Sequence, residues 1–274
     1  MDEKFRIIGT SGAQAVERDY TDTPRWKDVL YRFSRNKGAL LGAIAIILVV
    51  IFAALGPLAT SHTYDGINTK RQNLPPRIPV VENVGIFDGT RSGVDVYEQK
   101  NCADEYYYFG TDSLGRDLWA RVCYGTRISL YIALVAVIID MVVGITFGMV
   151  CGYFGGVVDM ILQRIVEVIN GIPQLVVVTL LLVILKPGLF TITLALMITS
   201  WIGMSRVVRA QVLQLKEQEY ILASRTLGTP TPVILFREIL PNTMGQVIIM
   251  AMMSVPSAIF MESFLSFVGL GIPK

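Results

Sequence analysis

Two carboxylates stand inside long apolar runs and are the first candidates for chemistry. Asp140 interrupts the apolar run 128–153, and Glu262 interrupts the run 243–268. An isolated charge in such surroundings costs on the order of several kcal/mol, so each carboxylate must face protein or water. In a functional role the two would line a route through the protein or carry protons along it. In a structural role each would join a hydrogen bond between helices and fix their packing.

No other group of residues has the types and spacing of a catalytic or metal site. The stretch 110–117 places two glycines at the separation of a phosphate-binding loop. Arg116 and Asp117 then stand where that loop needs a lysine and a hydroxyl for magnesium. The one histidine, His62, has no partner motif. The sequence offers no means of hydrolysing ATP, so we expect that the chain is not an enzyme and holds no metal.

The elements that position the two carboxylates are apolar blocks long enough to cross a bilayer. Hydrophobic residues make up 53% of the 274 residues and charged residues 17%, and the mean hydropathy is +0.54. A transmembrane helix needs about 20 mainly apolar residues. The expected spans are 39–59, 128–153, 165–185, 189–204 and 243–268. We therefore expect an all-α polytopic membrane protein. The net charge of +2 gives no sign of nucleic-acid binding.

Basic residues beside the spans predict the orientation of the chain. They cluster just before the first span and again between the fourth and fifth, whereas the tight turn between the third and fourth has only Lys186. Loops rich in lysine and arginine stay on the cytoplasmic side. We therefore expect a cytoplasmic N-terminus, a cytoplasmic segment 216–242 and an extracellular segment 60–127. The leading residues are polar, so no cleavable signal peptide is expected.

The N-terminal region 1–38 combines a polar tail with an amphipathic stretch. Residues 1–22 have few apolar anchors and are expected to be poorly ordered. Apolar residues then recur at helical spacing between basic ones. They are Trp26, Val29, Leu30 and Phe33. This pattern predicts a helix lying along the inner membrane surface, and a hydrated extension of the first span is the alternative.

The segment 60–127 is too rich in apolar and aromatic residues to be a linker. Its prolines and glycines predict a small folded cap of turns and short strands. Cys102 and Cys123 both fall in this segment and could pair, while Cys151 lies near the other side of the membrane. Free thiols are the simpler expectation, and the pairing stays open.

Two features inside the spans predict how the helices pack. Gly144, Gly148, Gly152 and Gly156 recur at every fourth residue. Such a stripe lets two helices approach closely, either within this chain or against a second subunit. Pro173 should kink the third span, because proline lacks an amide donor and clashes with the preceding turn. A kinked helix suits a translocation route, although many kinks have no such role.

The segment 216–242 is the most charged interruption among the apolar runs. Its first part predicts a short helix over 219–227 with two small residues on its surface. Gly228 stands where a helix would end, and two nearby prolines prevent its continuation. A second short apolar helix is expected to end at Asn242, where the chain returns to the membrane. Small residues on an exposed helical face predict a docking surface.

This segment resembles the coupling loop, or EAA loop, of the membrane subunits of ATP-binding-cassette importers. The matching residues are Leu222-Ala223-Ser224, Gly228 and Leu240-Pro241. Leu222 replaces the family's glutamate and Glu238 stands in for its isoleucine. The oligopeptide and dipeptide branch is looser at both positions and favours the Glu219-Tyr220 pair found here. The stretches 109–117, 152–156 and 170–173 also resemble that branch.

The resemblance implies the second permease subunit of an oligopeptide importer, with the long outer segment most like Gram-positive versions. It implies the transmembrane domain of a type I importer working by alternating access. The implied partners are a homologous permease subunit, two cytoplasmic ATPases that bind ATP and Mg²⁺, and an extracellular peptide-binding lipoprotein. No cofactor is expected in this chain. Dipeptides, nickel chelates or other small solutes are alternative substrates.

The resemblance also assigns roles to particular residues. The residues expected to couple the chain to an ATPase are Glu219, Ala223, Ser224, Arg225, Leu227 and Gly228. Asp140, Glu262 and Pro173 are weaker candidates for the translocation route, where a carboxylate would meet a peptide's amino terminus. In the family a sixth span usually follows the stretch matched here by 265–271, and five spans are expected within the 274 residues given. The sequence is then either a shortened form or one without the sixth span. A rival from another class is an ion-coupled secondary transporter whose carboxylates carry protons.

Overall fold

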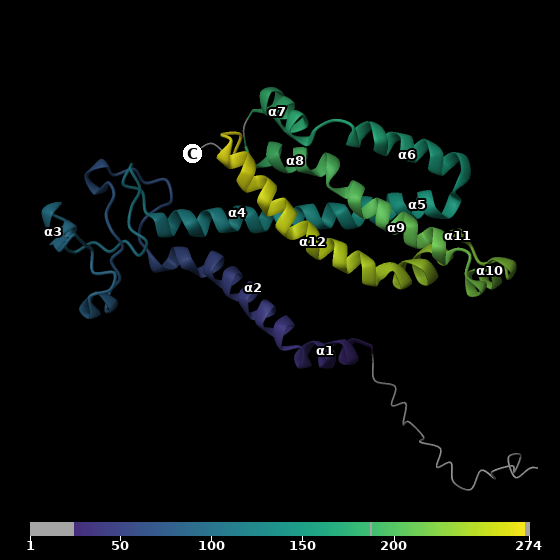
Figure 1. Ribbon diagram of the computed structural model, residues 1–274, viewed down its shortest axis with the longest axis horizontal. Coiled ribbons are helices and arrows are strands. Elements are labelled where there is room, and N and C mark those ends of the chain that lie inside the picture. The colour runs from purple at the N-terminus through teal and green to yellow at the C-terminus, as the bar shows by residue number, and fades with distance from the viewer. Residues whose placement is uncertain (1–24, 187, 272–274) are drawn as a thin grey trace, which may run out of the picture. The chain divides into compact units, whose positions relative to one another are not determined.

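The computed structural model describes residues 25–186 and 188–271, and helices dominate it (Figure 1). The chain forms two compact units, Met1–Phe52 and Ala53–Lys274. The longer helical elements are α1 (Arg25–Arg35), α2 (Lys37–Leu55), α4 (Leu118–Ile139), η6 (Asp140–Gly144), α5 (Ile145–Phe154), α6 (Gly156–Asn170), α7 (Gln174–Leu185), α8 (Leu189–Thr199), α9 (Trp201–Leu215), α10 (Glu219–Thr226), η7 (Ile234–Ile239) and α12 (Leu240–Phe267). Among the described residues, four helices are long and apolar enough to cross a membrane, and a bent pair makes a possible fifth.

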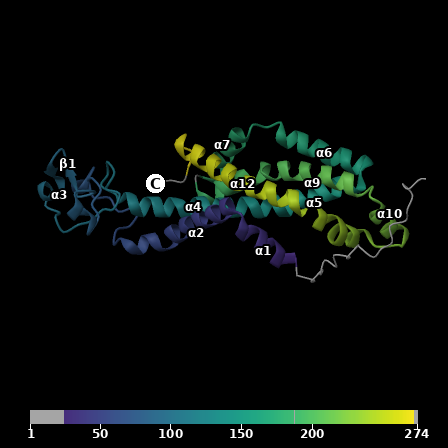
Figure 2. The same ribbon diagram turned by 60° about the horizontal axis from the view of Figure 1, so that its bottom comes forward.

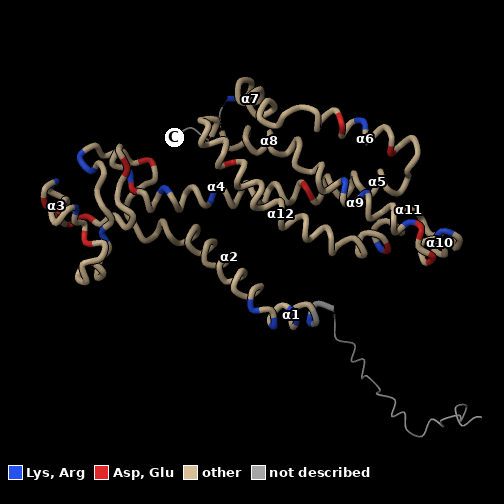
Figure 3. The backbone as a smooth tube through the Cα atoms, in the orientation of Figure 1, with Lys and Arg blue, Asp and Glu red and all other residues tan. Residues whose placement is uncertain are grey.

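Helices α1 and α2 are separate elements rather than one extended helix. Asn36 lies between them, and its side-chain Oδ1 accepts hydrogen bonds from the amides of Gly38 at 3.1 Å and Ala39 at 3.2 Å. An asparagine in this position satisfies amides that the first turn of a helix leaves unpaired. Lys and Arg gather along α1 (Figure 3). The predicted amphipathic helix is therefore distinct from the first span, while residues 1–24 and the side chain of Trp26 lie outside the description.

The segment 60–117 folds as turns, 3₁₀ helices and a two-stranded hairpin, as its composition predicts. The hairpin pairs β1 (Thr90–Arg91) with β2 (Val94–Asp95) and leads into α3 (Val96–Gln99), while 3₁₀ turns cover Thr69–Arg71 and Val81–Val84. Its small core contains Leu74, Tyr97, Cys102 and Tyr107. Cys102 and Cys123 are both buried free thiols, so the pairing left open by the sequence does not form.

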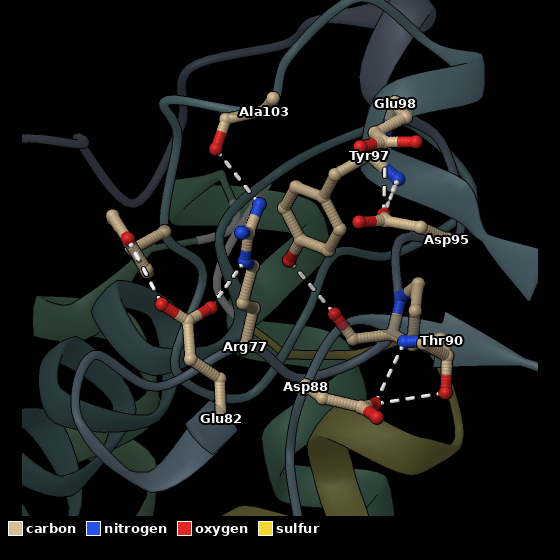
Figure 4. Close-up of polar contacts among 10 residues, drawn as sticks. Arg77, Glu82, Asp88, Thr90, Asp95, Tyr97, Glu98 and Ala103 are labelled. Carbon is tan, nitrogen blue, oxygen red and sulfur yellow. Dashed lines mark hydrogen bonds and ion pairs between the residues drawn. The ribbon is translucent and has the colours of Figure 1, made fainter. Parts of the chain in front are cut away.

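A partly buried arginine, Arg77, supplements the small apolar core of this fold with polar contacts. Arg77 donates from Nε to Glu82 at 2.7 Å and from Nη1 to the carbonyl of Ala103 at 2.8 Å (Figure 4). The hydrogen bond to Glu82 raises the pKa of Arg77. Tyr97 is fully buried and donates its hydroxyl to the carbonyl of Pro75 at 2.8 Å. A planar guanidinium can satisfy several acceptors at once, which suits a fold made of turns.

The glycine-containing stretch before α4 uses its carboxylates to build the turn. Asp112 accepts hydrogen bonds from the amides of Leu114 and Arg116, each at 2.9 Å. Asp117 caps α4 by accepting from the amide of Trp119 at 2.9 Å. Both carboxylates are therefore occupied by the protein itself, in agreement with the rejection of a phosphate-binding loop.

The helix that contains the predicted second span begins well before residue 128. Helix α4 starts at Leu118, and with η6 and α5 it forms one helical segment, Leu118–Phe154. Polar residues such as Arg121 and Arg127 belong to this helix, and the membrane boundary at residue 128 stays a prediction. Arg127 donates to the carbonyls of Ala53 at 2.6 Å and Ala54 at 2.9 Å. It thereby satisfies carbonyls that the end of α2 leaves unpaired.

The predicted third span is broken, not merely kinked. Helices α6 and α7 meet at an angle of 74°, and the expected continuous helix 165–185 does not form. Pro173 precedes α7 with an extended ψ of 128°. Its carbonyl accepts the amides of Val176 and Val177 at 2.9 and 3.3 Å. Proline cannot donate to the preceding turn, so the chain leaves α6 and starts a new helix.

The helices that contain the last two predicted spans extend beyond the residues expected to cross the membrane. The fourth continues from Leu189 to Leu215, well beyond residue 204. The helix expected to end at Asn242 does not end there, because η7 passes directly into α12 and the segment Thr231–Phe267 is continuous. Pro241 is tolerated because it lies in the first turn of α12, where a missing amide costs little.

Three of the four stripe glycines pack α5 and η6 against α9. A Cβ on Gly144 would lie 2.7 Å from Met204 Cβ, one on Gly148 2.6 Å from the Ser205 carbonyl oxygen, and one on Gly152 2.7 Å from Val212 Cβ. Each distance is shorter than any real Cβ contact. The stripe therefore serves packing within this chain. Gly156 would meet nothing within 4 Å and starts α6 instead, so the expectation of a four-glycine face was wrong at that position.

Candidate functional site

Helix α10 ends in a turn that depends on glycine. Gly228 adopts a φ of 80°, and its amide donates to the carbonyl of Arg225 at 2.9 Å. The amide of Thr229 donates to the carbonyl of Ser224 at 3.0 Å, which completes a Schellman motif. A Cβ on Gly228 would meet nothing within 4 Å. The position therefore needs glycine for its left-handed backbone and not for space.

One face of α10 is fixed to the helical core by three different contacts. Ile221 is fully buried in the core cluster that also contains Ile234 and Val212. Ser224 donates its hydroxyl to Glu238 Oε1 at 2.8 Å. The guanidinium carbon of Arg225 lies 4.6 Å from the ring centroid of Tyr153. Because these contacts reach both α5 and η7, displacement of α10 must also displace the helices that hold it.

The other face of α10 is open and mixes apolar side chains with a carboxylate. Glu219 and Ala223 are exposed, and Leu222 exposes 47% of its surface. Leu227, beside the glycine turn, exposes 86%. Helix α10 lies at one end of its unit, and the segment 60–117 lies at the other (Figures 1 and 2). A protruding helix with a rigid base and an apolar outer face has the features of a docking element.

Asp140 and Pro173 line the same cavity, which has a volume of about 460 Å³. Asp140 belongs to the π-helical turn η6 and exposes only 2% of its surface. Its Oδ2 accepts the hydroxyl of Ser254 at 2.5 Å. One of the two carboxylate oxygens of Asp140 therefore makes the hydrogen bond between helices that its structural role predicts.

Glu262 lies apart from that pair. It lines a second cavity of about 500 Å³, whose wall includes Arg116 and Arg121 near the segment 60–117. Its two oxygens accept hydroxyls from Ser129 at 3.1 Å and Ser266 at 3.0 Å. The three residues expected along one route therefore divide between two cavities.

The sequence did not single out several residues that complete these sites. Ser254 lies in an apolar run, where a lone hydroxyl gives no periodic signal. Tyr153 falls in the stretch 152–156, which indicated a family resemblance and no contact with α10. Within the described part of the chain, no group of three or more His, Cys, Asp or Glu side chains is placed to hold a metal ion.

Two family models match this chain. Residues 144–273, which include α10 and α12, match the binding-protein-dependent transport system inner membrane component. Residues 24–76 match the N-terminal transmembrane domain of oligopeptide transport permease C. The oligopeptide transport system permease protein OppC of Bacillus subtilis is 40% identical over 248 residues, covering 90% of this chain and 72% of the relative. The chain belongs to this family of transport permeases.

Other relatives place the permease in the same branch. The dipeptide transport system permease protein DppC of Bacillus subtilis is 43% identical over 246 residues, covering 90% of this chain and 68% of that protein. DppC of Lactococcus lactis is 36% identical over 283 residues, covering 99% and 82%. The predicted resemblance to the oligopeptide and dipeptide family is confirmed. The family is the membrane component of binding-protein-dependent transport systems, and the permease is a multi-span helical membrane protein of that type.

Proposed function

We propose that this permease carries peptides into the cell as one membrane subunit of an ATP-driven importer. The observation that carries the proposal is helix α10, which is fixed at its base and exposed on its other face. Its residues fit the coupling loop of such importers. Curated relatives named as oligopeptide and dipeptide permeases support peptides as the substrate class. Oligopeptides are the substrate we propose, and dipeptides are the alternative that competition with peptides of different length would reveal.

The proposed complex contains four further parts. A homologous permease subunit pairs with this one, two ATPases bind ATP and Mg²⁺ on the cytoplasmic side, and a binding lipoprotein delivers peptide outside. The N-terminus and α10 then face the cytoplasm, and the segment 60–117 faces outward. Basic residues on and beside α1 support this orientation, because such residues stay on the cytoplasmic side.

Coupling would follow from the way α10 is held. An ATPase groove binds the outer face of α10 at Glu219, Ala223 and Leu227. ATP binding moves the groove, and the contacts of Ser224 and Arg225 pass that movement to the helical core. A ligand shifts such an equilibrium only by its different affinity for the two states, so ATP and the loaded binding protein must both favour outward opening.

Cysteine crosslinking in the intact membrane tests this docking. Leu227→Cys places a thiol on the outer face of α10, and the native Cys102, Cys123 and Cys151 are buried and give little background. Phe190→Cys is a matched control, because Phe190 is also strongly exposed but begins α8, away from α10 (Figure 1). A bifunctional reagent should join the first variant, and not the second, to an ATPase. Equal yields from both variants, or none from Leu227→Cys, would overturn the docking.

Energy dependence separates this proposal from ion-coupled transport. Peptide uptake should stop when cellular ATP is depleted and should continue when the proton gradient is collapsed. The opposite pattern would favour carboxylates that carry protons. An impermeant thiol reagent applied to whole cells should spare Leu227→Cys and label a cysteine at exposed Val94, and the reverse result would invert the proposed orientation.

A further inference from the structure

The cavity beside Asp140 lies where two helical segments depart from regular α-helix. Its wall includes the π-helical turn η6 and the break between α6 and α7 at Asn170 and Pro173. Ser200, between α8 and α9, also lines it and keeps a helical backbone. Helix α12 contributes Ser254 and its neighbours to the wall. Interrupted helices expose backbone and polar side chains at membrane depth, which is tolerated where they line a cavity.

Two buried polar atoms in this wall lack a partner in the structure. Asp140 Oδ2 accepts from Ser254, but Asp140 Oδ1 is buried without a hydrogen bond. The hydroxyl of Ser200 is also buried and unpaired. A role in packing accounts for only one oxygen of the carboxylate. A buried acceptor without a donor costs on the order of 1–3 kcal/mol, so the second oxygen calls for a ligand that donates.

No basic side chain lines the described wall of this cavity beside Asp140. Among the described residues of its wall, Asp140 is the one charged side chain, and the others are polar or apolar. The wall consists of Ala136, Asp140, Asn170, Ile172, Pro173, Gln174, Leu196, Thr199, Ser200, Met250, Met253, Ser254, Ser257, Ala258 and Met261. A buried anion is stable only when a cation or hydrogen-bond donors accompany it. A positively charged hydrogen-bond donor would satisfy the unpaired oxygen of Asp140 most strongly.

The size and lining of the cavity select an organic cation over a metal ion. A volume of about 460 Å³ is that of a site for a small molecule. Calcium or magnesium would need several oxygen ligands in a fixed geometry, whereas this wall supplies a single carboxylate. Three methionines, Met250, Met253 and Met261, provide a soft surface that adapts to different side chains. Gln174, at the start of α7, can donate to carbonyl oxygens.

We propose that this cavity binds the ammonium group at the amino terminus of a peptide in transit, with Asp140 Oδ1 accepting from it. This assignment rests on the proposed function and names the group that the route recognises. The methionine face of α12 contacts the first side chains without selecting among them. Asp140 is then a binding residue that favours peptides with a free amino terminus.

Asp140→Asn in the complete importer tests the assignment. The change conserves size and can keep the hydrogen bond with Ser254, but it removes the charge. Uptake of a peptide is compared with uptake of its N-acetylated form, and the preference is measured in native and variant importers. The binding protein is the same in both importers, so comparing their preferences removes any selection that it makes. Loss of a charge-assisted hydrogen bond should reduce the preference by about tenfold or more.

Thr193→Val is the matched control. Thr193 is a buried membrane hydroxyl that donates to the carbonyl of Leu189 within its own helix and does not line the cavity. Its loss should leave the preference unchanged. Asp140→Glu should retain part of the preference because it keeps the charge. An unchanged preference in Asp140→Asn, or an equal loss in Thr193→Val, would overturn the assignment.

A second measurement keeps the test valid if Asp140→Asn transports poorly. Ser257→Cys places a thiol in the wall, and its labelling is followed with a cationic and a neutral methanethiosulfonate of similar size. The cationic reagent should react faster when Asp140 is present, and the ratio of rates should fall about tenfold in Asp140→Asn. An unchanged ratio would show that the cavity does not attract cations. If the native importer takes up peptide but Asp140→Asn leaves the ratio of labelling rates unchanged, this inference alone is refuted. If the native importer shows no ATP-dependent peptide uptake, the proposed function is refuted.

Discussion

Gly148→Ala tests whether the close packing of α5 on α9 requires a residue without a Cβ at position 148. The new Cβ would lie 2.6 Å from the carbonyl oxygen of Ser205, 2.8 Å from Val208 Cβ and 3.0 Å from the amide of Arg209. Two of these three atoms belong to the backbone of α9 and cannot rotate away. The two helices must therefore separate by several tenths of an ångström along their shared face.

The expected magnitude follows from two opposing effects. Overpacking a well-filled interface costs about 1–3 kcal/mol. Replacing glycine with alanine inside a helix recovers up to about 1 kcal/mol of helix propensity. The net result for Gly148→Ala should be a loss of about 1–2 kcal/mol in the free energy of unfolding. Gly125→Ala is the control, because a Cβ at Gly125 in α4 would meet nothing within 4 Å and only the propensity gain should remain.

Thermal unfolding of the purified permease in detergent measures both variants. Gly148→Ala should unfold at a lower temperature than the native chain, while Gly125→Ala should unfold at the same temperature or a higher one. If both variants are equally stable, the close approach of α5 and α9 does not exist in the folded protein. If both are destabilised equally, the loss reflects any added methyl group and not this interface.

Three further predictions address the segment 216–242 and the segment 60–117. Gly228→Val should strain the left-handed turn by about 1–2 kcal/mol or more and uncouple ATP hydrolysis from uptake without loss of membrane insertion; normal peptide uptake would count against the docking geometry. Ser224→Ala should leave Glu238 without its donor, at about 1–3 kcal/mol, and increase hydrogen exchange in α10; unchanged exchange would contradict the proposed base of the helix. The hydrogen bond from Arg71 holds the pKa of Glu105 below its ordinary 4.5, so this pair stabilises the segment above about pH 4.5 and the stability is lost as pH falls through the lower folded value. Protease cleavage within residues 60–117 should rise at acid pH in the native chain, and Glu105→Gln should be more susceptible at neutral pH and show a smaller rise. An identical pH profile in both would refute the role of the pair.

Much of the architecture was predictable because apolar blocks are a strong signal. The first span and the helix α10 with its stop at Gly228 follow from composition and from a glycine followed by prolines. The ends of the other spans were less predictable. Arg121 and Arg127 have the composition of a polar loop, but both belong to α4. Tertiary contacts supply their acceptors, because Arg127 donates to carbonyls at the end of α2 and Arg121 donates to Asp112. Hydrogen bonds between residues far apart in the sequence produce no periodic pattern from which they could be predicted.

The candidate sites show the same division. The residues of α10 are close in sequence, so their common face could be predicted from helical spacing alone. Asp140 and Pro173 share a cavity only because η6 and the break before α7 come together in three dimensions. Ser254 lies 114 positions from Asp140, and a single hydroxyl in an apolar run gives no hint of that partner. The separation of Glu262 from this cavity was equally invisible in the sequence.

The positions of the rigid and interrupted elements indicate how movement at α10 would reach the cavity. Helix α9 is unbroken from Trp201 to Leu215 and packs closely on η6 at Gly144 and on α5 at Gly148 and Gly152. Arg225 joins α10 to the end of α5 at Tyr153. Close-packed helices transmit displacement because their interface has no free volume in which to absorb it. The π-helical turn η6 and the break at Pro173 both contribute to the wall of the cavity beside Asp140. Since deformation concentrates where backbone hydrogen bonding is already interrupted, a displacement of α10 should change the shape of the wall around Asp140 before it changes the packing of α5 against α9.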